Sequence, residues 1–148
     1  MSATPQILPA GVTSIDLTVR YAETDQMGIA YHANYLVWCD MARTALLRAH
    51  GLSYRDLEAG GLLLAVVEAH VRYRSPARFD DRLVVQCWPR DVSSRGVEFG
   101  YSVAQLDSGR LVATARTVLI ALDRTHVRSR LPADVRAGLV PIADPVRL

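Results

Sequence analysis

Residues 35–50 constrain the fold most, because their pattern predicts a helix that is apolar around most of its circumference. Leu, Ala, Met and Arg, which favour helices, dominate this segment, and Gly51 follows as a residue suited to end it. We expect Asn34 to cap the start of the helix. A helix with so wide an apolar surface must be covered by protein on most of its sides.

The segments around this helix have the period of β-strands. Residues 14–21 alternate apolar and polar side chains, which predicts one strand before the helix. After a short helix at residues 53–59, we expect strands at residues 62–73, 82–88, 96–106 and 111–122, and a closing helix at residues 131–139. Pro89 should end the second of these strands, since it has no N–H for a ladder. This order predicts an α+β fold in which a curved antiparallel β-sheet wraps around one long buried helix.

The size and composition of the chain narrow the class of protein. Its 148 residues suit a flexible N-terminal arm, residues 1–12, and a single domain, residues 13–148. A formal net charge of +2 gives no reason to expect nucleic acid, and no apolar run is long enough for membrane insertion. All seventeen basic residues are arginines, which excludes lysine chemistry such as Schiff bases. Cys39 and Cys87 lie in apolar runs and should be buried thiols, so we expect a reducing, cytoplasmic location.

Residues 21–35 concentrate the chemistry of the chain. Glu23 and Asp25 lie in a short polar turn beside Gly28, and His32 follows just before the predicted helix. A carboxylate, a glycine that lets backbone approach a ligand, and a helix N-terminus with free N–H groups are components of an acyl-transfer site. We therefore expect the active site in this segment.

Several motifs in the same order carry a family resemblance. They are YAETDQMG at residues 21–28, YHANY at residues 31–35, MART at residues 41–44 and SPARFDD at residues 75–81. Together they resemble the hotdog-fold acyl-CoA thioesterases, and most of all the 4-hydroxybenzoyl-CoA thioesterase-like group, which includes the Tol–Pal-associated enzymes. The resemblance runs from about residue 18 to residue 123. It implies a hotdog fold and hydrolysis of an acyl-CoA thioester, with no cofactor besides the substrate.

The resemblance places the catalytic carboxylate at Asp25. A carboxylate can attack the thioester and form a mixed anhydride, or it can act as a general base toward water, and the sequence leaves both routes open. The alternative is that Asp25 only forms an Asx-turn before Gly28. We interpret the neighbouring Glu23 as a solvated surface acid.

The remaining site residues follow from the same resemblance. The backbone N–H of His32 would polarise the thioester carbonyl, and its imidazole would position water or substrate, or else merely join the turn to the helix. Gly28, Tyr31, Asn34 and Tyr35 would line the acyl side of the site, with Asn34 also able to orient Asp25. Asp40 would pair with Arg43 or Arg48, or face the acyl pocket of a neighbouring subunit. Ala45 stands where the family often carries a glutamate, which bears on substrate preference and rate.

The phosphates of CoA require cationic and hydroxyl groups at the pocket mouth. By position we expect Arg74, Arg78, Ser94 and Arg95 to supply them. We expect no metal, because the other histidines show no ligand spacing with one another or with a cysteine.

Three functions remain open from the sequence. The first is an acyl-CoA thioesterase, acting on acyl-CoA or on an acyl-carrier-protein thioester, as the homodimer or homotetramer in which the family joins sheets edge to edge. The second is a hotdog hydratase or dehydratase that uses Asp25 and His32 on an acyl thioester. The third is a non-catalytic module that binds acyl-CoA or acyl-carrier protein.

Overall fold

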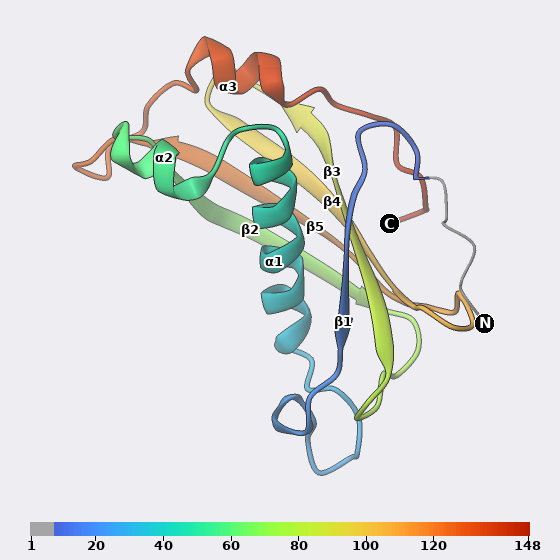
Figure 1. The fold of residues 1–148 in the computed structure, drawn as a ribbon. Coiled ribbons are helices and arrows are strands. Elements are labelled where there is room, and N and C mark those ends of the chain that lie inside the picture. The colour runs from blue at the N-terminus through green and yellow to red at the C-terminus, as the bar shows by residue number, and fades with distance from the viewer. Residues whose placement is uncertain (1–7) are drawn as a thin grey trace.

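The structure, a computed structural model, describes residues 8–148 (Figure 1). The elements follow the predicted order, with one strand, a long helix and a short helix before four strands and a closing helix. They are β1 (Thr13–Thr18), the 3-10 turn η1 (Tyr21–Glu23), α1 (Asn34–Ala49), α2 (Tyr54–Ala59), β2 (Leu63–Tyr73), β3 (Arg82–Val92), β4 (Gly96–Gln105), β5 (Leu111–Leu122) and α3 (Ala133–Gly138).

The five strands form one antiparallel sheet in the order β1-β3-β4-β5-β2. The sheet is curved, and α1 lies against one of its faces and contacts β1 and β3 (Figure 1). The predicted α+β fold, a curved antiparallel sheet around one long helix, is therefore confirmed. The outermost strands are β1 and β2, and each has one edge that no other strand of the chain pairs with.

Alternation along the strands separates two faces of the sheet. On β4, Tyr101 faces α1 and is fully buried in the core. Its neighbour Gly100 lies opposite Trp88 on β3 and Arg116 on β5, on the face turned away from α1. We call this second face the outer face. The C-terminal segment reaches it, since the indole N–H of Trp88 donates a hydrogen bond of 2.9 Å to Asp144.

The side of α1 that faces the sheet supplies much of the core, including Trp38, Ala42 and Leu46. On the opposite side, Leu36, Val37 and Met41 are 40%, 52% and 47% exposed. Within a single chain, the sheet therefore covers α1 on one side, and part of the apolar surface that its sequence predicts stays exposed to solvent. The protein cover expected on most sides of the helix is not complete within one chain.

A buried arginine anchors the middle of α1. Arg43 is almost fully buried, and it donates hydrogen bonds to the hydroxyls of Tyr54 (2.7 Å) and Tyr101 (2.9 Å) and to the carboxylate of Asp40. Burial alone would lower the pKa of Arg43, but the two hydroxyls raise it, so the guanidinium stays charged. The predicted pairing of Asp40 with an arginine on its own helix is confirmed.

The end predicted for the second of the four strands is wrong. β3 continues past Pro89 to Val92, and the pairing with β4 changes register between Pro89 and Asp91. A β-bulge tolerates a residue without an N–H, because the bulge already interrupts the ladder there. The Pro89 carbonyl accepts a hydrogen bond from Ile142 (3.0 Å), which fixes the C-terminal segment to this strand.

Two further observations concern the ends of the chain and its helices. Of the arm predicted for residues 1–12, residues 1–7 lie outside the described part of the chain. Between residues 8 and 148, no helix has the length and hydropathy that crossing a membrane requires.

Candidate active site

Residues 24–30 form a tight loop between β1 and α1. The Asp25 N–H donates to the Ile29 carbonyl (3.0 Å), and the Gly28 N–H donates to the Asp25 carbonyl (2.9 Å). Gly28 has a φ of +75°, a left-handed conformation that glycine adopts without cost. Ala30 then bonds to the Ala77 carbonyl (2.7 Å), which ties the loop to the segment after β2. The loop is therefore held from both ends.

The carboxylate of Asp25 has one oxygen bound and one free. Oδ1 accepts a hydrogen bond of 2.9 Å from the Met27 N–H, which is the Asx-turn considered as the structural alternative. Oδ2 accepts no hydrogen bond from any residue between 8 and 148. The turn fixes the direction of the carboxylate and leaves its second oxygen available to a ligand.

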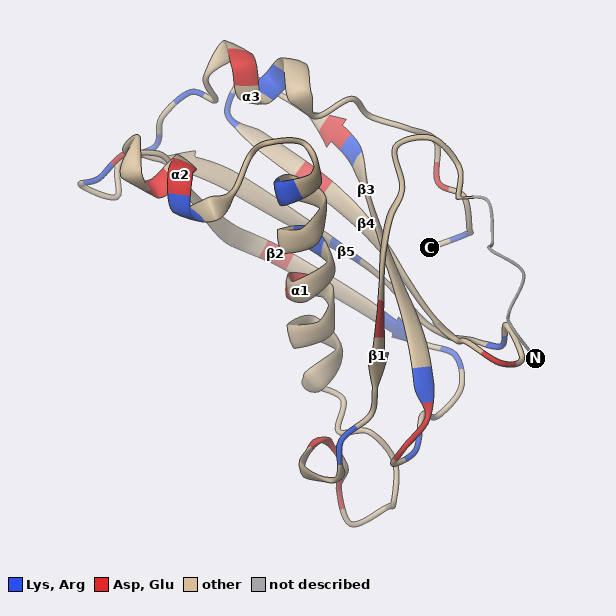
Figure 2. Ribbon diagram, viewed as in Figure 1, with Lys and Arg blue, Asp and Glu red and all other residues tan. Residues whose placement is uncertain are grey.

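Asp25 lines a hollow of about 440 Å³ at the end of the sheet beside the start of α1. This volume lies within the range of about 300–1,000 Å³ that is typical of small-molecule sites. Charged residues of both signs surround the loops at this end of the molecule (Figure 2). The hollow is lined by the polar residues Asp25, His32, Tyr35, Tyr73, Arg74 and Ser75 and by the apolar residues Met27, Ile29, Ala30 and Pro76.

The interpretation of Glu23 as a solvated surface acid is wrong. Its side chain is buried, with Oε1 accepting from the Arg20 N–H (2.9 Å) and Oε2 from the indole of Trp38 (2.7 Å). Burial alone would raise the pKa of Glu23, but these hydrogen bonds and the Arg20 guanidinium lower it. Glu23 thus connects the loop to α1 through its carboxylate and does not line the Asp25 hollow.

Asn34 does not cap α1 with its side chain, so that prediction is wrong as well. The cap residue is Ala33, and no side chain bonds to the cap. Asn34 is the first residue of the helix, and its Nδ2 donates a hydrogen bond of 2.8 Å to the Glu23 carbonyl. The Asn34 amide therefore holds the backbone of Glu23, two residues before Asp25, and does not bond to the Asp25 carboxylate itself.

His32 lies at the junction between the loop and α1. Its carbonyl accepts a hydrogen bond of 2.8 Å from the Tyr73 hydroxyl, while its backbone N–H donates to no backbone acceptor in the described chain. The imidazole lies against the ring of Tyr31, with centroids 4.5 Å apart. A free N–H just before the first turn of a 16-residue helix favours negative charge on a ligand oxygen.

Tyr73 is one of the lining residues that the sequence did not predict, as are Ser75 and the apolar residues Met27, Ile29, Ala30 and Pro76. Tyr73 packs edge-on against Tyr35, with ring centroids 5.1 Å apart, and both side chains line the hollow. Burial raises the pKa of both tyrosines, which keeps their hydroxyls protonated. Its place at the end of an alternating strand was the available signal, because the alternation sends this side chain to the face that carries α1.

The expected CoA-binding residues do not meet within one chain. Arg74 lines the Asp25 hollow. Arg78 is not among the lining residues, and its backbone N–H donates a hydrogen bond to the carboxylate of Asp81. Arg95 instead lines a different hollow at the β3–β4 turn, next to Ser94. The Arg74 N–H donates to the Val112 carbonyl, and the Arg95 carbonyl accepts from the Ala121 N–H. Val112 and Ala121 both lie on β5, nine residues apart, so Arg74 and Arg95 are separated by roughly 30 Å along the sheet.

The hollow contains neither Asp40 nor a cluster of metal ligands among the described residues. Asp40 is exposed and pairs with the buried Arg43 of the same helix, and its side chain is absent from the lining of the hollow. Across residues 8–148, no three histidine, cysteine or acidic side chains come together as a metal site would require.

Comparison with known proteins shows the family of the chain. The family model of the thioesterase-like superfamily matches residues 19–139. The Bacillus subtilis (strain 168) protein named "Putative acyl-CoA thioesterase YneP" is 40% identical over 113 residues, which cover 76% of this chain and 81% of that protein. The acyl-CoA thioester hydrolase YbgC of Escherichia coli O6:H1 (strain CFT073) is 30% identical over 120 residues, covering 80% of this chain and 89% of that protein.

Solved thioesterase structures share the fold of this chain. A crystal structure of the DHNA-CoA thioesterase from Staphylococcus aureus superposes with a TM-score of 0.78 at 30% identity, covering 81% of this chain and 80% of that one. The chain therefore belongs to the thioesterase-like superfamily, with the hotdog fold that its motifs predicted.

Proposed function

We propose that this protein hydrolyses the thioester bond of an acyl-CoA to a free acid and CoA, with Asp25 as the acting carboxylate. One observation carries the proposal: a carboxylate with a free oxygen lines the same hollow as His32, whose N–H lies at the start of α1. Family membership supports thioester hydrolysis as the reaction class.

The reaction needs an oxygen nucleophile and a place for the charge that forms on the carbonyl oxygen. By one route Asp25 Oδ2 attacks the carbonyl carbon, the C–S bond breaks and water then hydrolyses the mixed anhydride. By the other route Asp25 removes a proton from water as that water attacks, and the proton passes to the departing thiolate. In both routes the His32 N–H would stabilise the oxyanion.

The two routes differ in where a labelled oxygen goes. In a single turnover with enzyme in excess in ¹⁸O-water, the nucleophilic route places ¹⁸O in the carboxylate of Asp25 when water attacks the Asp25 carbon of the anhydride, and in the product acid when water attacks the acyl carbon. The general-base route places it only in the product acid. Label in the peptide that contains Asp25, measured by mass spectrometry, therefore establishes the nucleophilic route.

We further propose that the active protein is a homodimer or homotetramer. β2 is an edge strand of 11 residues on which Val66 and Val67 are 49% and 51% exposed, and such an edge is suited to pairing with another strand. Arg95 lies too far along the sheet to reach the Asp25 hollow of its own chain, so it would serve CoA only from a second copy. Light scattering of the purified protein measures the assembly directly.

The central test replaces Asp25 by Asn and measures thiol release from a panel of acyl-CoAs. Asn preserves the Asx-turn to Met27 but is neither a nucleophile nor a base, so we expect kcat to fall at least about a hundredfold, the scale of lost acid–base catalysis. The matched control is Asp107→Asn on the exposed β4–β5 turn, which should keep wild-type kcat. Near wild-type hydrolysis by Asp25→Asn would refute the assignment.

A hydratase is the second candidate, because Asp25 and His32 line the same hollow and could act as an acid and a base on an enoyl thioester. Incubation with crotonyl-CoA distinguishes the two reactions, since hydration removes the enoyl absorbance and hydrolysis releases a free thiol. If the protein instead binds acyl-CoA tightly and turns over neither substrate, it is a binding module.

A further inference from the structure

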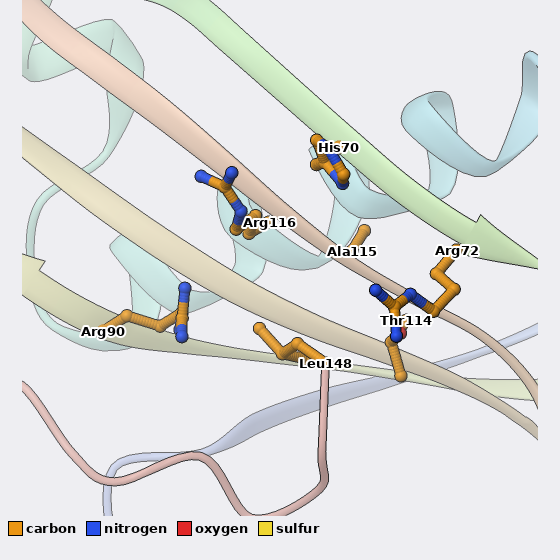
Figure 3. A pocket seen from close by; sticks show the side chains of 7 residues that line it. All are labelled: His70, Arg72, Arg90, Thr114, Ala115, Arg116 and Leu148. Atoms are coloured by element: carbon orange, nitrogen blue, oxygen red, sulfur yellow. The ribbon is translucent and has the colours of Figure 1, made fainter.

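The outer face of the sheet carries a second hollow, of about 280 Å³, that is rich in arginine (Figure 3). Arg72 comes from β2, Arg116 from β5 and Arg90 from β3. The register explains the cluster, because Arg116 pairs with His70 across the β2–β5 ladder and Thr114 pairs with Arg72 two residues away. These four side chains therefore share the face that α1 does not cover.

The arginines differ in how much of their charge is already neutralised. Arg90 is fully engaged, donating to Asp144 (2.8 Å) and to Glu98 (2.7 Å). Arg116 only approaches Glu98 at 3.5 Å, the outer limit of a hydrogen bond. Arg72 makes no ion pair with any acid of the described chain. Two guanidinium groups therefore keep most of their donors for a ligand.

A buried hydroxyl in the same hollow lacks a partner. Thr114 is 1% exposed, and its Oγ1 is the one buried side-chain polar atom between residues 8 and 148 without a hydrogen bond. Buried hydroxyls are nearly always satisfied, because leaving one unpaired costs free energy. Thr114 pairs with Arg72 across the β2–β5 ladder, and its side chain lies beside Arg72, with Arg116 two residues further along β5 (Figure 3). A ligand with several oxygens could therefore accept from the hydroxyl and from the arginines that line the same hollow.

The geometry points to a phosphate-binding site on the outer face, formed by Arg72, Arg116 and Thr114 with His70 at its side. A phosphate group offers only acceptors, carries up to two charges and matches the planar fork of arginine. The hollow is smaller than most small-molecule sites, which fits a compact group. Arg90 forms ion pairs with both Glu98 and Asp144. Its charge is therefore already neutralised, so it forms one wall of the site and does not bind the anion.

This site is separate from the hollow that holds Asp25. Tyr73 lines the Asp25 hollow on the α1 side of β2, whereas its neighbour Arg72 points to the outer face. The proposal does not depend on thioester hydrolysis, and binding can be measured without turnover. The phosphate could be inorganic, or it could be the ester of a nucleotide.

Calorimetric titration of the full chain with sodium phosphate tests the site, against sodium chloride at matched ionic strength. We expect saturable binding to the wild type and a loss of affinity of about tenfold in Arg72→Gln and in Arg116→Gln, equivalent to one charged hydrogen bond. Thr114→Val keeps the shape and should weaken binding a few-fold. Arg55→Gln on the exposed surface of α2 removes the same charge elsewhere and should bind as the wild type does.

Two results would overturn the proposal. One is no saturable phosphate binding to the wild type, and the other is an equal loss of affinity in Arg55→Gln, which would mean a general charge effect. Because Arg72 is exposed, Arg72→Gln should stay folded, and its circular dichroism spectrum in chloride verifies this.

A second titration identifies the source of the phosphate. If adenosine 3′,5′-bisphosphate binds more tightly than inorganic phosphate and loses that advantage in Arg72→Gln, the site takes a nucleotide phosphate. If both probes bind the wild type equally, the site takes a free phosphate. The same affinity of both probes for wild type and Arg72→Gln would exclude a site at Arg72.

Discussion

The indole N–H of Trp38 donates a hydrogen bond of 2.7 Å to the carboxylate of Glu23. Fifteen residues separate the two in the chain, and the bond fixes the start of the active-site loop to the second turn of α1. Of the two acids in that loop, one is therefore structural and the other, Asp25, is free to act.

Glu23→Gln should destabilise the fold by about 2 kcal/mol, the scale of a hydrogen bond to a charged group. The carboxylate accepts from both the Arg20 N–H and Trp38, whereas an amide of the same shape has only one oxygen for these two donors. Urea unfolding at neutral pH measures the change. Glu58→Gln, on the exposed surface of α2, is the control and should stay within a few tenths of a kcal/mol of the wild type. Equal stability of Glu23→Gln and wild type would contradict the structural role.

The same carboxylate should make stability depend on acidity. Its pKa is lower in the folded chain than the ordinary value of 4.5, so the folded state binds the proton less readily than the unfolded state. The stabilisation is therefore complete above that ordinary value and is lost as the pH falls through the lower, folded pKa. We expect the difference in unfolding free energy between wild type and Glu23→Gln to shrink as the pH falls below 4.5. A difference that stays constant down to acid unfolding would show that the charge contributes nothing.

Local pattern predicted the elements because each is encoded within its own segment. The alternation of β4 and β5 and the apolar length of α1 identify them without knowledge of their neighbours. The errors arise where a distant partner overrides a local preference. Pro89 is tolerated inside β3 because a bulge lies next to it, and Asn34 bonds to the Glu23 carbonyl instead of capping its helix.

The active site shows the same division. Asp25, Gly28 and His32 lie close together in the sequence, so their chemistry can be recognised from one short segment. Alternation along β2 indicates the face to which Tyr73 points, but the end of β2 lies beside the loop because of the strand order in the sheet, which no local pattern contains. Arg95 was assigned to the CoA site by position along the chain, and the length of β5 places it at the other end of the sheet.

Gly28→Ala should destabilise the loop by about 1–2 kcal/mol, the cost of a left-handed conformation for a residue with a Cβ. The cost is conformational and not steric, because a Cβ at Gly28 would meet no atom of residues 8–148 within 4 Å. Asn tolerates this conformation better, so Gly28→Asn should recover part of the loss. Thermal unfolding compares the three proteins. If Ala and Asn were equally costly, the φ of +75° would not be the cause.

Arg43→Met should destabilise the core by about 2–3 kcal/mol, because the Tyr54 and Tyr101 hydroxyls each lose a charged donor. Asp40 adds little to that cost, since its side chain is 60% exposed and water replaces the arginine. Met fills much of the same volume, so the loss reports on hydrogen bonds more than on packing. The control is Arg48→Met on the exposed surface of the same helix, and chemical denaturation of both variants gives the comparison. A similar small effect for the two would mean that the buried network is not needed.

Tyr73→Phe should lower kcat about fivefold while leaving the fold nearly as stable as the wild type. The variant removes one hydrogen bond of 2.8 Å, from the Tyr73 hydroxyl to the His32 carbonyl, whose loss is worth about 1 kcal/mol. The carbonyl and the N–H of His32 lie in adjoining peptide planes that meet at its Cα. Loss of the Tyr73 bond should therefore loosen the backbone that aims this N–H at the oxyanion in our proposal, and weaken the transition state more than the bound substrate. We therefore expect KM to change less than kcat in steady-state thiol release. Tyr21→Phe, at an exposed tyrosine outside the hollow, is the matched control and should leave both constants unchanged. A rise in KM at constant kcat would instead assign Tyr73 to substrate binding alone.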